Sequence, residues 1–281
     1  MFANKIWWIT GASSGIGAAL AESLSQAGAK LILSGRNLAA LKDVAGRCKT
    51  PSLILPFEAT DFASIPAHVE TAWSWAQGQG GGIDGLVNNA GISQRSLAVD
   101  TVFEVYRKIV DVDLMAPIAL TQALLPRMVK AGGASIVAIS SVAGIAGPPL
   151  RSAYAAAKHG LIGYHDSVRA ETDHLGIKVL VVAPGSVRTD VSKNALDADA
   201  KSRGVSDAAI DKGMDPMVAA TRILDALKAG ERELILAEGM EAEIARLRRA
   251  DPNALFDLMA KMVASGYAKQ MGAEKPGSAG F

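Results

Sequence analysis

Short apolar runs alternate along the chain with longer stretches of helical periodicity. Several of the runs are apolar almost throughout, as strands buried on both faces of a parallel sheet are. Strands are expected at residues 6–10, 30–34, 52–56, 85–88, 135–140, 178–183 and 233–236. Helices are expected near residues 15–27, 38–48, 62–77, 101–130, 152–175 and 216–229. This alternation predicts an α/β protein with a doubly wound, seven-stranded parallel sheet flanked by helices.

The chain contains no internal repeat and no linker that would separate two domains. We therefore expect one domain over residues 1–237. Within it, the polar, loop-like residues 186–215 are expected to form a substrate lid. Residues 238–281 are expected to form a C-terminal helical extension, with two amphipathic helices up to residue 270 and a frayed tail from residue 272.

Composition narrows the class of protein. The 281 residues are 49% hydrophobic and 20% charged, enough for one large core. The net charge of +1 gives no basic excess for nucleic acid or an anionic membrane surface. Cys48 is alone, which excludes an internal disulfide and fits a reducing cytoplasm. The apolar run at the start is too short for a signal peptide or membrane span. A soluble cytoplasmic protein without nucleic-acid or membrane partners is expected.

A glycine-rich turn follows the first predicted strand. The stretch TGASSGIG (10–17) leads from that strand into an alanine-rich helix. Its glycines allow a tight turn and a close approach of the backbone to a pyrophosphate, with the first N–H groups of the helix facing the anion. Such glycines also occur in ordinary turns, but this strand–turn–helix context favours a Rossmann-type dinucleotide site. The expected contacts are Gly11, Ser13, Ser14, Gly15, Ile16 and Gly17.

The end of the second predicted strand bears on the cofactor. A site for NAD(H) usually carries an acidic residue here for the ribose hydroxyls. This chain has Gly35 and then Arg36, whose guanidinium suits a phosphate. The sequence therefore favours NADP(H), with a surface arginine that meets nothing as the alternative.

Tyr154 and Lys158 lie four residues apart in SAYAAAKHG (152–160), on one face of a predicted helix. A free phenol titrates near pH ~10, and a nearby ammonium lowers that value. The tyrosine can then donate a proton to a carbonyl oxygen as hydride arrives, or remove one from an alcohol. The small residues around the pair are expected to leave room for cofactor and substrate.

Ser141 lies thirteen residues before Tyr154, at the end of the fifth predicted strand. Ligands of α/β proteins bind at such carboxyl ends, so its hydroxyl is expected to polarise the substrate oxygen. A serine at a strand end is commonly only a turn residue, and Tyr-x-x-x-Lys also arises by chance. Their combination with a nucleotide-binding turn favours a catalytic set. No pair among the four histidines has metal-ligand spacing backed by a third ligand, so no metal is expected.

With these motifs, residues 5 to about 237 resemble the short-chain dehydrogenase/reductase family. NNAG (88–91) and PGSVRT (184–189) add to the resemblance. It implies that Asn88, Ala90 and Gly91 border the adenosine, and that Lys158 also grips the nicotinamide ribose. It further implies that the nicotinamide carboxamide is held by Pro184, Gly185, Val187 and Thr189. Glu58 and Ala59 fall where the family usually has an aspartate and an apolar residue beside the adenine.

One departure from the family pattern concerns the proton relay. In VDVDLMAP (110–117), Asp113 stands where the family usually has an asparagine that completes the relay. A carboxylate brings a charge and lacks the two amide donors. Asp113 either positions a water beside Lys158, whose charged form it would favour, or faces away and leaves the relay to water.

The substrate side is expected to be apolar. The expected pocket lies between the 141–150 loop, the residues after NNAG and the lid, with contacts from Ser93, Val142, Ile145, Leu150 and Ser186. No lysine or arginine is obviously placed to clamp a substrate carboxylate; Arg151 and Arg188 are candidates, but solvated positions are expected for both. The lid also resembles a subgroup that includes microsomal animal reductases with an N-terminal membrane anchor, which is not expected here. A neutral, hydrophobic ketone or secondary alcohol is expected.

The sequence thus predicts NADP(H)-dependent oxidation or reduction of a carbonyl–alcohol pair. Tyr154 is the expected acid/base, Ser141 the oxygen-binding donor, and Lys158 the group that tunes the phenol. Two rivals stay open: an NADP(H) sensor without turnover, and a sugar-nucleotide epimerase, which normally needs a larger substrate domain. The resemblance also implies a homodimer or homotetramer, paired through helices 101–130 and 152–175.

Overall fold

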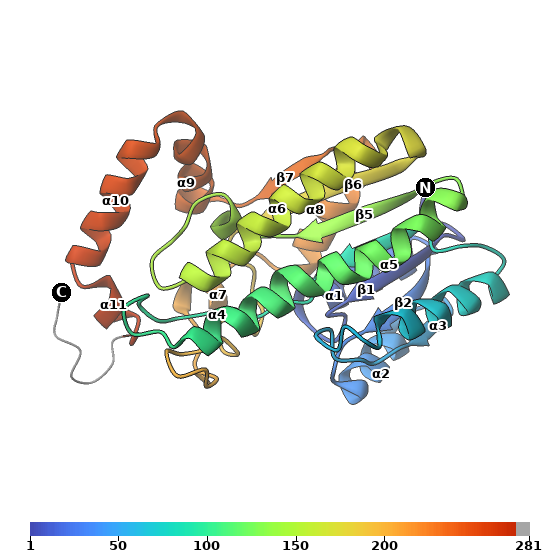
Figure 1. Cartoon of the computed structure of the whole chain (residues 1–281), viewed down its shortest axis with the longest axis horizontal. Coiled ribbons are helices and arrows are strands. Elements are labelled where there is room, and N and C mark those ends of the chain that lie inside the picture. Colours follow the sequence, from blue (N-terminus) through green and yellow to red (C-terminus); the bar gives the residue numbers. More distant parts are fainter. Residues whose placement is uncertain (274–281) are drawn as a thin grey trace.

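The computed structural model describes residues 1–273. Over these residues a seven-stranded, wholly parallel sheet forms in the order β3-β2-β1-β4-β5-β6-β7 (Figure 1). The strands are β1 (Ile6–Thr10), β2 (Lys30–Ser34), β3 (Ser52–Ile54), β4 (Gly85–Asn88), β5 (Ala134–Ile139), β6 (Ile177–Pro184) and β7 (Glu233–Leu236). The predicted doubly wound sheet is confirmed, with β3 two residues shorter than expected.

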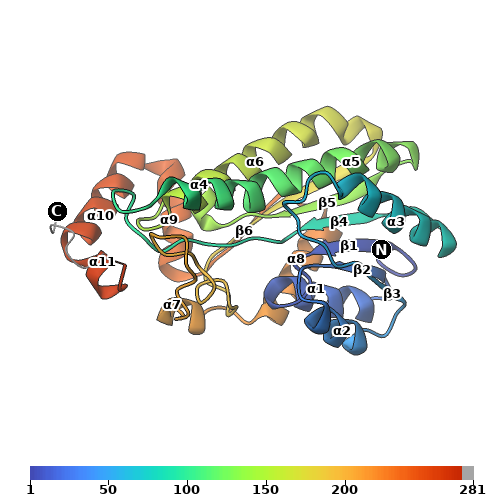
Figure 2. The same cartoon turned by 60° about the horizontal axis from the view of Figure 1, so that its bottom comes forward.

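Helices cover both faces of the sheet, as Figure 2 shows. One face carries α1 (Gly15–Gln26), α2 (Leu38–Arg47) and α8 (Pro216–Ala229). The other carries α3 (Ile65–Gly78), α5 (Ala116–Lys130) and α6 (Ser152–Thr172), with α4 (Phe103–Val110) packed against α6. Strand β1 illustrates why both faces are apolar: Trp7 and Ile9 belong to the core under α1, whereas Ile6 and Trp8 belong to the core under α3 and α5.

The predicted helix 101–130 is interrupted. A π-helical turn, η1 (Asp111–Met115), joins α4 to α5. Such turns are rare and often lie at functional sites. The combined run Phe103–Lys130 is long and apolar enough to cross a membrane by length and composition. Its apolar side chains Leu120, Leu124 and Met128 pack into the core beneath the sheet, which accounts for that composition.

The C-terminal extension lies at one end of the molecule, beside the lid (Figure 1). Its described part has α9 (Gly239–Ala250), α10 (Pro252–Ala264) and the short α11 (Tyr267–Gln270), three helices where two were expected. Ala268 of α11 packs against Leu150. The lid contains one short helix, α7 (Ala208–Asp211). The predicted fraying from residue 272 lies almost entirely outside the described residues.

Candidate active site

The turn after β1 approaches the turn after β4 closely. Gly11 has φ +63°, a left-handed conformation that favours glycine. A Cβ on Gly11 would lie 2.9 Å from the Cα of Ala90. The side-chain amide of Asn89 donates to the carbonyls of Thr10 and Gly11 at 3.0 and 3.2 Å and ties the two turns together. Asn89 was not among the predicted site residues, although it is the second asparagine of NNAG.

A cavity of about 610 Å³ runs along the carboxyl ends of the strands. That volume is in the range of small-molecule and cofactor sites. The predicted cofactor residues that line it are Gly11, Ser13, Ser14, Gly15, Ile16, Arg36, Glu58, Ala59, Ala90, Gly91, Pro184, Gly185, Val187 and Thr189. Glycine backbone beside the first helix suits the pyrophosphate of a nicotinamide dinucleotide, and a cation beyond β2 suits a phosphate on its adenosine ribose. The residues present therefore fit such a cofactor.

Two predicted cofactor residues lie behind the cavity wall. A Cβ on Gly17 would overlap the carbonyl oxygen of Gly11, so this glycine lets α1 pack against the turn. Asn88 is buried, and its amide donates to the hydroxyl of Thr121 at 2.9 Å and lies 3.4 Å from Nε2 of His165. Both residues support the site from beneath.

Helix α6 brings Tyr154 and Lys158 to the cavity wall, one turn apart. The Nζ atom of Lys158 lies 5.6 Å from the centre of the Tyr154 ring. The small residues around the pair have a different role from the expected one: Ala153 and Ala157 pack against α4. Small side chains therefore allow two helices to approach, and this approach positions the tyrosine.

Ser141 follows β5 and also lines the cavity. Its hydroxyl accepts a hydrogen bond from the backbone N–H of Ala143 at 3.1 Å and donates to the carbonyl of Pro184 at 3.3 Å. The first contact fixes the oxygen at the start of a 3₁₀ turn, Val142–Gly144. The second is long, so the hydroxyl proton can turn to a substrate oxygen at low cost.

Lys158 is 3% exposed and lies close to two oxygen atoms. Its ammonium donates to the carbonyl of Ile139 at 3.1 Å and forms an ion pair at 3.1 Å with Oδ2 of Asp113. An ammonium has three donors, so at least one N–H is left for a ribose hydroxyl. Burial acts to lower the pKa of Lys158, but the charges of Asp113 and Tyr154 outweigh it and raise that pKa. The lysine is a cation at neutral pH.

Asp113 faces Lys158 rather than away from it. The π-helical turn places its side chain inside the protein, where Oδ1 accepts from the backbone N–H of Ile92 at 2.8 Å. Complete burial raises the pKa of the Asp113 carboxyl, against the opposing effects of Lys158 and of the Ile92 N–H. The carboxylate thus lies directly behind Lys158.

Arg36 lines the cavity near Glu58. The guanidinium of Arg36 lies 3.6 Å from the Glu58 carboxylate, and both side chains are exposed. Exposed pairs of this kind contribute little to stability. Arg36 is therefore free to turn toward an anionic group in the cavity.

The wall around the catalytic set differs from the expected one. Its apolar residues in this region are Ile92, Val112, Val191, Leu196, Ala200 and Ile210, and its polar ones include Lys108, Asp190, Asn194 and Ser202. Among the described residues that line the cavity, none of the five predicted substrate contacts appears.

Burial and other contacts explain that difference. Val142 and Leu150 are buried, and Leu150 packs against the C-terminal extension. Ile145 follows the 3₁₀ turn and is half-buried. Ser93 accepts a hydrogen bond from Arg95, and Ser186 is bound by Glu241. The lid, rather than the 141–150 loop, therefore supplies most of the apolar wall. In the described part of the chain no group of three potential metal ligands occurs.

Comparisons with known proteins agree with this geometry. A model of the short chain dehydrogenase family matches residues 5–200. The chain is 39% identical over 280 residues to dehydrogenase/reductase SDR family member 7B of Danio rerio, covering 97% of this chain and 88% of the relative. It is 38% identical over 262 residues to the protein of that name from Bos taurus, and the match covers 92% of this chain and 81% of that relative. The crystal structure of a short-chain dehydrogenase from Streptomyces avermitilis has a TM-score of 0.75 at 29% identity, covering 93% of this chain and 98% of that one.

Proposed function

The chain belongs to the short-chain dehydrogenase/reductase family and is an oxidoreductase, and from that premise we propose that it transfers a hydride between NADP(H) and a carbonyl–alcohol pair. The observation that carries the proposal is the convergence of Ser141, Tyr154 and Lys158 on the cavity that the glycine-rich turn also lines. A nicotinamide cofactor supplies or accepts the hydride when bound. Side chains of the protein polarise the substrate oxygen and move the proton.

In the reducing direction, Ser141 donates a hydrogen bond to the carbonyl oxygen and polarises it. Tyr154 then gives its phenolic proton to that oxygen as negative charge develops there. Lys158 stabilises the resulting phenolate, because its ammonium lies beside the ring. The same atoms work in reverse when an alcohol is oxidised.

The preference for NADP(H) rests on Gly35 and Arg36. No carboxylate follows β2 to bind ribose hydroxyls, whereas the guanidinium of Arg36 lines the cavity and is held only by an exposed carboxylate. A phosphate would draw it away from Glu58, since paired planar hydrogen bonds to phosphate are strong. These features support NADP(H) over NAD(H).

A neutral, hydrophobic substrate remains our proposal. The support comes from Leu196, Ala200 and Ile210 of the lid, which face the cavity together with Ile92 and Val112. Lys108 and Asp190 also line the cavity and bring one charge of each sign. This balance gives no net attraction for an anionic substrate.

The deciding experiment follows the loss of NADPH absorbance with a panel of aromatic and aliphatic ketones. We expect turnover with hydrophobic members, and Tyr154→Phe should abolish it while NADPH still binds. A protein that binds NADPH but reduces no carbonyl and oxidises no alcohol would be a cofactor sensor. Turnover restricted to charged polar substrates would contradict the proposed substrate class.

A further inference from the structure

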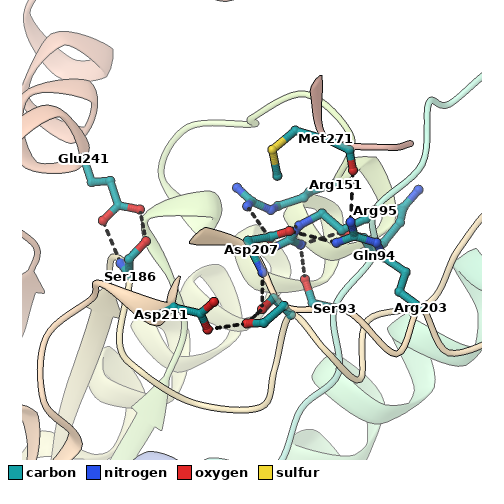
Figure 3. Close-up of polar contacts among 12 residues, drawn as sticks. Ser93, Gln94, Arg95, Arg151, Ser186, Arg203, Asp207, Asp211, Glu241 and Met271 are labelled. Carbon is teal, nitrogen blue, oxygen red and sulfur yellow. Dashed lines mark hydrogen bonds and ion pairs between the residues drawn. The ribbon is translucent and has the colours of Figure 1, made fainter. Parts of the chain in front are cut away.

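The C-terminal extension contacts the loop expected to hold the nicotinamide, residues 184–189, called here the cofactor loop. Glu241, in the first turn of α9, extends its carboxylate to Ser186 (Figure 3). One carboxylate oxygen accepts from the backbone N–H of Ser186 at 2.6 Å, and the other accepts from its hydroxyl at 2.9 Å. Charge-assisted hydrogen bonds of this kind are stronger than neutral ones. The backbone next to Val187, which lines the cavity, is thereby held from outside the Rossmann domain.

The packing around Gly185 also shows that the Glu241 carboxylate lies in close contact with the cofactor loop. A Cβ at this position would overlap Oε2 of Glu241 and lie 3.1 Å from the Cβ of Ala237. Only a residue without a side chain leaves space for the carboxylate there. The contact between α9 and the cofactor loop is thus close-packed as well as hydrogen-bonded.

A second set of contacts fixes the lid through the carboxylate of Asp207. This residue is 4% exposed and receives the guanidinium of Arg95 at 2.6 and 2.5 Å. Arg203 donates to its other oxygen at 2.8 Å, and Arg151 lies 3.8 Å away. We call these four residues the Asp207 cluster (Figure 3). It joins the segment after β4, the residue before α6, and the lid.

The Asp207 cluster also reaches the extension. Arg203 donates from its remaining terminal nitrogen to the carbonyl of Met271 at 3.0 Å. Its neighbour Ser202 lines the cavity, as do Leu196 and Ala200 earlier in the lid and Ile210 in α7. The position of Arg203 therefore determines where the substrate wall lies.

We propose that Glu241 and Arg203 are positioning residues through which the C-terminal extension completes the active site. Glu241 sets the cofactor loop, and Arg203, anchored by Asp207 and Met271, sets the substrate wall. The inference rests on the proposed function for the identity of the two ligands. The two contacts act on different parts of the cavity, so their loss affects different ligands.

The first arm of the test measures NADPH binding without any carbonyl present. Glu241→Ala should weaken NADPH binding roughly tenfold, since two charge-assisted hydrogen bonds are lost. Glu241→Gln keeps one acceptor for the Ser186 N–H and should lie between the wild type and the alanine variant. Glu243→Gln is the matched control, because within residues 1–273 Glu243 pairs only with Arg246, on the exposed side of the same helix. It should leave the NADPH dissociation constant unchanged.

The second arm measures the lid. Arg203→Ala should raise the KM for the carbonyl roughly tenfold and speed cleavage within residues 186–215 by an aspartate-specific protease, whose sites neither this variant nor its control removes, with NADPH affinity unchanged. Lys201→Ala, an exposed change two residues away, is the matched control. Arg203→Lys replaces the planar guanidinium by a single ammonium, so its KM should lie between those of the wild type and the alanine variant. If the alanine variant does not fold, the lysine variant carries the same comparison.

The outcomes separate this inference from the proposed function. NADPH binding and cleavage by the aspartate-specific protease are read without turnover, so both arms give an answer even if no ketone is reduced. Equal losses of NADPH affinity in Glu241→Ala and Glu243→Gln would overturn the role of Glu241. If Glu241→Ala and Arg203→Ala both lost cofactor and carbonyl affinity to the same extent, the extension would only stabilise the fold, and the proposal would be wrong.

Discussion

The ammonium of Lys158 lies 3.1 Å from the carboxylate of Asp113, and both side chains are almost wholly shielded from water. The pair is neutral overall, whereas a lysine beside a neutral amide would keep its full charge. The field that Lys158 exerts on Tyr154 is therefore partly offset. The carboxylate of Asp113 is therefore part of the electrostatic environment in which Lys158 acts on Tyr154.

Replacing Asp113 by asparagine should move the pH dependence of alcohol oxidation to lower pH. An asparagine keeps the acceptor for the Ile92 N–H but removes the charge behind Lys158. The ammonium then stabilises the phenolate more, and the rate should reach its plateau at lower pH by about one pH unit. Initial rates of oxidation between pH 6 and pH 11, as chosen test conditions, check the shift.

Asp111→Asn provides the matched control for this shift. Asp111 lies two residues away on the same π-helical turn and is half-buried. Its variant should show the wild-type profile. Identical profiles for all three proteins would mean that the Asp113 carboxylate does not act on the reaction.

Replacing Ser141 by alanine should lower kcat for carbonyl reduction by about 100-fold, because one donor to the developing oxyanion is lost. NADPH affinity should stay within twofold, since the serine contributes a hydroxyl and no charge. Ser141→Thr retains a hydroxyl and should recover part of the rate. Steady-state kinetics and NADPH titration measure the two effects separately, and a fall in affinity equal to the fall in kcat would reject the assigned role.

Replacing Arg36 by alanine should raise the KM for NADPH by roughly 10- to 100-fold, the value of a charge-assisted contact. The KM for NADH should change little, because NADH lacks the phosphate. Glu58→Gln removes the carboxylate that competes for the guanidinium and should improve NADPH binding slightly. A wild-type enzyme that prefers NADH, or an alanine variant that loses both cofactors equally, would contradict the assignment.

His165 should make stability fall as the solution is acidified. It is fully buried; its Nδ1–H donates to the Leu161 carbonyl, and burial lowers its pKa from 6.5 to about 4. The neutral form fits the fold, so its stabilising contribution is fully present above pH 6.5 and is lost as the pH falls toward 4. Between pH 7 and pH 5 this residue should account for a loss of about 2 kcal/mol in the free energy of unfolding.

Urea unfolding at these two pH values measures that loss. His165→Gln should show a smaller difference between pH 7 and pH 5 than the wild type. His159→Gln, an exposed change on the same helix, should keep the wild-type difference. Equal differences in all three proteins would assign the acid sensitivity to other groups.

Local pattern was enough to predict the sheet and the gathering of Ser141, Tyr154 and Lys158 at one cavity. Each strand is a contiguous apolar run, and Tyr154 and Lys158 are brought together by helical spacing alone. Ser141 and the glycine-rich turn follow strands directly, so the parallel sheet places them at one edge. Nothing in VDVDLMAP predicts the π-helical turn, because no proline or glycine interrupts it before Pro117.

The substrate wall depends on contacts that spacing does not reveal. Arg95 and Asp207 are 112 positions apart, and their pairing follows from how the lid folds back. The same folding draws Arg151, expected in solvent, into a largely buried cluster. The 141–150 loop looked like a wall because it is apolar, but Leu150 is covered by α11. The residues of the substrate wall are therefore set by how the lid and the extension pack against the rest of the chain, and local sequence patterns do not predict that packing.

The close fit of Glu241 over Gly185 also constrains how this protein can diverge. A side chain at position 185 and the acid at position 241 cannot occupy the same volume, so the tolerance of one site depends on the residue at the other. Substitutions at these two positions should be epistatic, because a larger residue at 185 would displace the Glu241 carboxylate and would therefore cost less in backgrounds that have already shortened 241. Mutant libraries that diversify the cofactor loop alone would miss those combinations.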